Sequence, residues 1–305
     1  MRSQSRRDFL KLMGITGAAC LASAAPLSAS TGPAADSDTA IAMLYDATKC
    51  VGCKACMSAC KRVNFDQNNL AYEQLESDKD KLWDAPLDLS GNTRTVIKLY
   101  KESDTRFSFV KHSCMHCTKP GCVSACPVKA MTKDPVTGVV AYDKNSCIGC
   151  RYCQVACPYN IPRFQWDRAL PQIVKCDFCK HTNLKERGKP ACGETCPAGA
   201  IAFGKRKDLL VEAHKRIKEN PDSYIPKVYG EKEVGGGNHL YLAAFPFKKL
   251  GLPDLKEESP TEFSEHIQHT IYKGFIAPVA LYGTLCAIAL KNKKAQDKLG
   301  HTEDD

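Results

Sequence analysis

Four runs of clustered cysteines constrain this chain more than any other feature. The third run has the spacing C-x2-C-x2-C-x3-C-P, which is a ligand pattern of 4Fe–4S clusters, because a short loop can wrap thiolates three residues apart around one cube. The first run repeats this spacing but is followed by Lys61, and the second and fourth runs have longer gaps before the third cysteine. The runs are Cys50, Cys53, Cys56 and Cys60; Cys114, Cys117, Cys122 and Cys126; Cys147, Cys150, Cys153 and Cys157; and Cys176, Cys179, Cys192 and Cys196.

The runs use sixteen of the eighteen cysteines, so the sequence predicts four 4Fe–4S clusters. Structural zinc is the first alternative, but C-x2-C-x2-C-x3-C-P is not a zinc-ribbon pattern. A disulfide framework is the second, but eighteen cysteines in 305 residues fall below the density of disulfide scaffolds. Cys20 and Cys286 lie in apolar stretches and are expected to be small hydrophobic residues. His116, inside the second run, is expected to be structural or exposed, with hydrogen bonding to a cluster as the alternative.

The charge balance argues against a nucleic-acid partner. The formal net charge is +9 at pH 7, but a 4Fe–4S site with four thiolates carries roughly −2, so four sites remove about eight charges. The sequence contains no P-loop, and the glycines at 235–237 lack the strand and helix of a dinucleotide-binding motif. We therefore expect no nucleic acid to be bound and no catalytic site.

Residues 1–29 have the features of a twin-arginine signal peptide. Arg6 and Arg7 lie in the segment Ser5–Lys11, followed by a mild apolar stretch with candidate cleavage positions after Ala24 and Ala29. Because clusters are inserted in the cytoplasm, a chain of this kind must cross the membrane already folded. We therefore expect the cluster domain on the periplasmic side of the cytoplasmic membrane.

The segments around the runs predict an α+β fold of two nested bacterial ferredoxin-like modules. The strand Ala40–Tyr45 is expected to pair with Ala200–Phe203, and Ala130–Lys133 with Val139–Tyr142 as a hairpin. An insertion with the β-prone segment Thr93–Tyr100 is expected to pack on the modules or on a partner. The expected boundaries are 40–61 with 174–206 for the outer module, 62–107 for the insertion and 108–160 for the inner module.

The C-terminal third predicts an extension, a membrane anchor and a tail. Lys207–Asn220 has apolar residues at helical spacing, His239–Ala243 resembles a strand, and the Pro- and charge-rich Phe245–Glu262 predicts an extended linker. Ile271–Leu290 is about 20 residues long, which suits a C-terminal transmembrane helix in membrane lipid, with a buried or surface helix as the alternative. The boundaries are 207–265 for the extension, 271–290 for the anchor and 291–305 for a cytoplasmic tail.

Segments along nearly the whole chain resemble a known group of electron-transfer subunits. They are Arg6–Arg7, Met43–Asp46, Cys114–Cys117, Cys150–Cys153, Tyr229–Glu233 and Ile267–Gly274. The layout of the four runs is similar to that of the electron-transfer subunits of the DMSO reductase, formate dehydrogenase and polysulfide reductase families. With its leader and C-terminal segments, the chain resembles more closely the ferredoxin-type subunits of hydrogenase-2-type nickel–iron hydrogenases.

This resemblance implies that three cysteines of one run and the last cysteine of a partner run hold each cluster. The implied ligand sets are Cys50, Cys53 and Cys56 with Cys196; Cys176, Cys179 and Cys192 with Cys60; Cys114, Cys117 and Cys122 with Cys157; and Cys147, Cys150 and Cys153 with Cys126. It also implies a non-catalytic relay between a periplasmic hydrogenase small and large subunit pair and a polytopic, quinone-reactive membrane subunit. The alternative is the same role in a formate dehydrogenase or a polysulfide or DMSO reductase complex.

Overall fold

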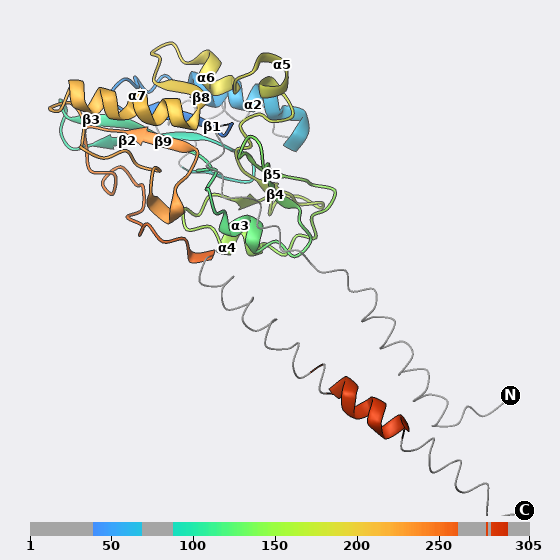
Figure 1. Ribbon diagram of the computed structural model, residues 1–305. Coiled ribbons are helices and arrows are strands. Elements are labelled where there is room, and N and C mark those ends of the chain that lie inside the picture. Colours follow the sequence, from blue (N-terminus) through green and yellow to red (C-terminus); the bar gives the residue numbers. More distant parts are fainter. Residues whose placement is uncertain (1–38, 69–87, 262–278, 280–281, 292–305) are drawn as a thin grey trace, which may run out of the picture. The chain divides into compact units, whose positions relative to one another are not determined.

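A three-stranded sheet joins the segment before the first cysteine run to segments that follow the last run. The structure is a computed structural model that describes residues 39–68, 88–261, 279 and 282–291. In it β1 (Ile41–Asp46) is antiparallel to β8 (Ile201–Lys205) and parallel to β9 (His239–Leu242), with the strand order β8–β1–β9 (Figure 1). The predicted pairing of Ala40–Tyr45 with Ala200–Phe203 is therefore confirmed.

Helix α7 (Arg206–Glu219) covers one face of this sheet (Figure 1). Successive side chains of a strand point to opposite faces, and Ala42 and Leu44 of β1 pack with Leu209 and Ala213 of the helix. The alternate residues of β1 belong to the main hydrophobic core instead. The amphipathic helix predicted for Lys207–Asn220 is confirmed, because its apolar positions are the ones that contact the sheet.

Helix packing brings the first and fourth cysteine runs together. α2 (Ala55–Asn68) contains Cys56 and Cys60 and packs against α6 (Ala191–Thr195), which contains Cys192. The loop between Cys179 and Cys192 also contains the short helix α5 (Asn183–Arg187). α2 continues past residue 61, so the helix crosses the boundary expected between the outer module and the insertion.

The two middle runs are joined by a short hairpin. β4 (Met131–Lys133) and β5 (Val140–Tyr142) are antiparallel, which confirms the predicted hairpin. Its turn is closed by Asp134, whose Oδ1 accepts the backbone N–H groups of Val136 and Thr137 at 3.0 Å each. The short helices of the two runs pack together, and another hairpin follows; these elements are α3 (Gly121–Ser124), α4 (Tyr152–Val155), β6 (Arg163–Phe164) and β7 (Ile173–Val174).

The described part of the 62–107 insertion packs on the cluster domain. β2 (Val96–Lys101) and β3 (Phe107–His112) form an antiparallel pair, so the strand tendency of Thr93–Tyr100 is confirmed. Val96 and Ile97 of β2 are buried in the main core. The remainder of the insertion, 69–87, lies outside the described residues.

The extended linker predicted for Phe245–Glu262 is wrong in its described part, which ends at residue 261. Phe245, Phe247, Leu250 and Leu252 are buried in the main core. Its later residues bond to the short 3-10 helix η3 (Glu233–Gly235), for example through Val234 N–H and Lys256 O at 2.8 Å. The prolines and charges of this segment prevent a regular helix or strand, but its apolar side chains are still buried by an irregular path.

No helix in the described part of the chain is long and apolar enough to cross a membrane. Residues 282–291 are helical, and apolar side chains such as Tyr282 and Leu285 are exposed on them. The predicted signal peptide at 1–29, half of the predicted anchor (271–278 and 280–281) and the tail after Lys291 lie outside the described residues.

Candidate iron–sulfur sites

The sixteen run cysteines lie in four groups of four thiols. In the first group, Cys50, Cys53, Cys56 and Cys196 line one small cavity, with Tyr45 at its wall. Burial raises the pKa of Cys56 to about 11, and the thiols of Cys50, Cys196 and Cys53 add to this rise. Three members come from the first run and the fourth from the last run.

The second group combines Cys60 with the other three cysteines of the fourth run. Burial raises the pKa of Cys60 well above its usual value, and the thiols of Cys179, Cys176 and Cys192 raise it further. All four cysteines are buried. This group is therefore the most enclosed of the four.

The third group combines cysteines of the second and third runs. Burial raises the pKa of Cys117, and the thiols of Cys114, Cys122 and Cys157 contribute in the same direction. Cys114 and Cys122 are buried, while Cys117 and Cys157 are partly exposed. This group is therefore less enclosed than the second group.

The fourth group is the reciprocal combination of the second and third runs and is less enclosed than the second and third groups. Burial raises the pKa of Cys153 to about 11, followed by the effects of the Cys126, Cys147 and Cys150 thiols. Cys153 is buried, and the other three are partly exposed. The four groups have the same membership as the ligand sets that the family resemblance implies.

Each run begins with the same backbone turn. The residue before the second cysteine has a left-handed conformation in all four runs: Gly52, His116, Gly149 and Phe178 have φ values of 71°, 47°, 72° and 54°. This turn directs backbone N–H groups at sulfur, as in the 3.4 Å contact from Gly149 N to Cys147 Sγ. Two runs adopt the turn without glycine, at a cost of about 1 kcal/mol per residue.

The two non-glycine turn residues support each other. The rings of His116 and Phe178 stack with their centroids 3.7 Å apart. His116 is fully buried, and its Nδ1 accepts the backbone N–H of Val140 at 3.0 Å. These contacts agree with the structural role expected for His116, and they exclude an exposed one, while its buried Nε2 has no hydrogen-bond partner among the described residues.

The donor atoms of the groups fit iron–sulfur clusters. Each group consists of four thiols, the ligand set of a 4Fe–4S cluster, without imidazole or carboxylate. Because the thiolate is the ligand, iron binding releases the protons that burial otherwise retains on these thiols. The described residues include no group of three or more Cys, His, Asp or Glu side chains that could hold a single metal ion.

Buried cations lie beside three of the groups. Lys111 is fully buried and bonds to Thr95 and, at 3.3 Å, to Ser113. Burial alone lowers its pKa, but the thiols of Cys192 and Cys56, from two groups, outweigh burial, so the pKa is raised. Lys175, also buried, opposes the rise in the pKa of thiols in the third group, namely Cys114, Cys122 and Cys157.

Sequence reasoning did not find these cations. Lys111 lies in β3 and Lys175 directly precedes Cys176, and lysines in either position are ordinarily exposed. A signal did exist for a third polar residue, Asn64, which follows Cys60 by four residues on a helix and therefore lies on the same helix face.

The groups form a series. The pKa of Cys192 in the second group is also raised by Cys56 of the first group. In the same way Cys114 of the third group acts on Cys176. Cys153 of the fourth group acts on Cys122. Neighbouring groups therefore adjoin in the order first, second, third and fourth.

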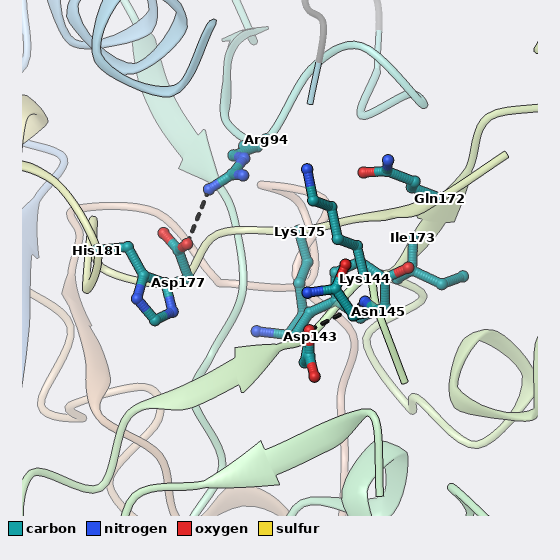
Figure 2. A pocket seen from close by; sticks show the side chains of 10 residues that line it. Arg94, Asp143, Lys144, Asn145, Gln172, Ile173, Lys175, Asp177 and His181 are labelled. Atoms are coloured by element: carbon teal, nitrogen blue, oxygen red, sulfur yellow. Dashed lines mark hydrogen bonds and ion pairs between the residues drawn. The ribbon is translucent and has the colours of Figure 1, made fainter. Parts of the chain in front are cut away.

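An open pocket lies beside the series, and no cysteine lines it. Its volume is about 240 Å³, and its lining includes Arg94, Asp143, Lys175 and Asp177. Figure 2 shows Arg94 and Asp177 pointing toward one another, with their ion pair drawn as a dashed line. The pocket borders the buried charges of the second group.

Comparisons with known proteins agree with the site. Residues 105–206 match the family model described as a 4Fe-4S dicluster domain. The hydrogenase-2 operon protein HybA of Escherichia coli O157:H7 is 40% identical over 286 residues, covering 83% of this chain and 85% of HybA. The nitrate-inducible formate dehydrogenase iron–sulfur subunit of E. coli K12 is 32% identical, with 82% of each chain covered. The chain therefore belongs to the 4Fe–4S protein family that includes HybA and the formate dehydrogenase iron–sulfur subunits.

Proposed function

We propose that this protein is a non-catalytic electron-transfer subunit that relays single electrons through four 4Fe–4S clusters. The observation that carries the proposal is the series of four groups of four thiols. The ligands would be Cys50, Cys53, Cys56 and Cys196; Cys60, Cys176, Cys179 and Cys192; Cys114, Cys117, Cys122 and Cys157; and Cys126, Cys147, Cys150 and Cys153.

The protein's own residues bind the clusters and set their surroundings. A 4Fe–4S cluster, when bound, supplies one-electron oxidation and reduction. The thiolates hold it, the left-handed turns direct N–H groups at sulfur, and the buried Lys111 and Lys175 compensate negative charge. Hydrogen bonds, charge and solvent exposure of this kind set the reduction potential of such a site.

Electrons would enter and leave at the two ends of the series. The first group has an exposed cysteine, Cys53, and the fourth has three partly exposed cysteines. Exposed apolar side chains also flank the ends, with Val51 in the first run and Ile148, Tyr152 and Val155 in the third. The inner groups would pass electrons between these ends.

The partners proposed for the two ends are a periplasmic nickel–iron hydrogenase and a quinone-reactive membrane subunit. The similarity to HybA favours this assignment, and the similarity to formate dehydrogenase subunits supports the same relay in a formate dehydrogenase complex. Purification of the intact complex from membranes separates the two, because either hydrogenase or formate dehydrogenase subunits accompany the chain. The twin-arginine motif and the apolar segment 271–290 support a location of the protein on the periplasmic side of the membrane.

Iron content and one cysteine variant test the relay. Anaerobically prepared, fully loaded protein should contain roughly sixteen irons, and a value near eight would refute four clusters. Absorption near about 400 nm that bleaches with dithionite would exclude zinc. Cys60→Ser should disturb the cluster of the fourth-run cysteines, whereas damage confined to the cluster of Cys50, Cys53 and Cys56 would refute the ligand sets.

A further inference from the structure

Asn64 places a side-chain amide against two thiols of the second group. It lies on α2, one turn after Cys60, and is 1% exposed. Its Nδ2 is 3.8 Å from Cys60 Sγ and 3.7 Å from Cys179 Sγ, and it also donates to Cys60 O at 2.8 Å. The amide therefore faces sulfurs from both runs that build this group.

The direction of the amide follows from its partners. Arg94 Nη1 lies 3.0 Å from Asn64 Oδ1, and a guanidinium can only donate hydrogen bonds. The atom facing Arg94 must therefore be the oxygen, and the NH₂ group must face the Cys60 carbonyl and the sulfurs. The reversed amide would oppose donor to donor and acceptor to acceptor.

A buried ion pair holds Arg94 in place. Its Nη1 is 3.0 Å from Asp177 Oδ2, and both side chains are almost fully buried (Figure 2). Asp177 Oδ1 in turn accepts the backbone N–H of Cys179 at 2.9 Å. The linked contacts of Asn64, Arg94 and Asp177 thus connect α2, the segment before β2 and the fourth run around a single group of thiols.

N–H donors at sulfur favour the more negative state of a cluster. An added electron increases the charge on the ligand sulfurs, so an amide aimed at them stabilises the reduced form more than the oxidised form. Backbone N–H groups also contact sulfurs of other groups, as from Ile161 N to Cys157 Sγ and Met131 N to Cys126 Sγ, each at 3.5 Å. A backbone donor cannot be removed by substitution, but the donor of Asn64 can.

We propose that Asn64 is a potential-setting residue, whose amide raises the reduction potential of the cluster held by Cys60, Cys176, Cys179 and Cys192. The inference rests on the proposed function, because it assumes that these four thiolates hold one cluster. The cluster in the second group would then have a higher reduction potential than its four thiolates alone would give it.

Two substitutions remove the donor in different ways. Asn64→Leu removes the amide, and Asn64→Asp keeps the shape but replaces the donor with a carboxylate. The matched control is Asn183→Leu. Asn183 is a buried asparagine in the loop between Cys179 and Cys192, and its side chain donates to Lys189 O and Glu194, each at 2.9 Å. Both of these acceptors are oxygens, so Asn183 donates to no sulfur through these bonds.

The measurement is a redox titration of the intact, loaded protein followed by EPR, with iron content determined for each variant. In Asn64→Leu, the equilibrium constant for one of the one-electron reduction steps should fall by at least about tenfold, which lowers its reduction potential by about 59 mV. The decrease should be larger in Asn64→Asp. The equilibrium constants of the remaining reduction steps should change by less than about threefold. The same limit should hold for every reduction step in Asn183→Leu.

The outcomes separate this inference from the proposed function. If wild-type protein binds four clusters and both Asn64 variants titrate like wild type, the inference is refuted and the relay stands. If both variants lose that one cluster, Asn64 is structural and the inference is refuted. If wild-type protein lacks a cluster at Cys60 and the fourth-run cysteines, the proposed function fails first.

Discussion

Lys111 and Lys175 are buried lysines that interact electrostatically with cysteines of the candidate iron–sulfur sites. Neither forms a carboxylate ion pair within the described part of the chain. The thiols that act on Lys111 belong to the first and second groups, and those on which Lys175 acts belong to the third. The positive charge of Lys111 therefore acts on the first and second groups, and that of Lys175 acts on the third.

This division predicts different effects for two matched substitutions. Lys111→Met should lower the potentials of the first and second clusters, and Lys175→Met that of the third, by about 1–2 kcal/mol per cluster, on the order of tenfold in the reduction equilibrium. Redox titration followed by EPR measures both. Identical patterns in the two variants would contradict the assignment of each lysine to its groups.

Asp134 provides a pH test in the β4–β5 turn. Partial burial disfavours its charged form, but the N–H groups of Thr137 and Val136 and the Lys180 ion pair outweigh this, lowering the pKa of Asp134 to about 2. Because the folded pKa lies below the unfolded value near 3.9, the stabilisation is complete above about pH 4 and is lost as the pH falls through about 2.

Asp134→Asn should therefore reduce the free energy of unfolding by about 1–2 kcal/mol at neutral pH. Denaturant unfolding at a series of pH values measures the difference between wild type and variant. The difference should be constant between pH 5 and pH 8 and shrink only below about pH 4. A difference that varies between pH 5 and pH 8 would point to another titrating group.

At the scale of elements, the two glycine turns of the first and third runs are similar in conformation but not in surroundings. An added Cβ at Gly52 would lie 2.4 Å from Phe109 Cε1, whereas one at Gly149 would meet Phe164 at an ordinary 3.8 Å. Both glycines have φ near 70°. Only the first turn therefore combines backbone strain with a side-chain clash.

Gly149→Ala should cost about 1 kcal/mol of stability, the price of a left-handed alanine. Gly52→Ala should cost about 3 kcal/mol, because the ring of Phe109 must also move. Thermal unfolding of the loaded proteins, together with their iron content, compares the two variants. Equal losses would mean that Phe109 can move at no cost, and the turn alone would then explain both effects.

How far the sequence predicts these elements depends on whether their signal is local. Cysteine spacing, the Asp134 hairpin and the apolar stripe of α7 are local patterns, and the structure has them where they are expected. Burial of Phe245, Phe247 and Leu250 depends on contacts with β2 and other distant segments, so Pro-rich sequence suggested a linker there. The contact of Asn64 with Cys179 likewise joins residues 115 positions apart.

For the whole molecule, the formal charge of +9 is misleading because it omits the clusters. Four clusters with their thiolates would add roughly −8 relative to protonated cysteines, and loss of the leader would remove more positive charge. The buried lysines are part of this balance, since each lies where cluster charge would be concentrated. The basic composition is therefore consistent with a nearly neutral loaded protein without any polyanionic partner.

The two ends of the chain predict one topology. Arg6 and Arg7 support export of the folded cluster domain, and Lys291, Lys293 and Lys294 follow the apolar segment 271–290, where positive residues favour the cytoplasmic side. A single helix cannot enclose a quinone site, so its use would be to hold the relay against a membrane partner.

Truncation after Glu262 should therefore release a soluble periplasmic protein that keeps its clusters, measured by iron content, but no longer passes electrons to quinone. In the full-length protein, protease added to intact spheroplasts should digest the cluster domain and spare a tag placed after Asp305. Detergent lysis before protease treatment is the control, because it must expose the tag. Cleavage of the tag from outside intact spheroplasts would mean that the segment does not span the membrane, so the relay would have to be held there by its partners alone.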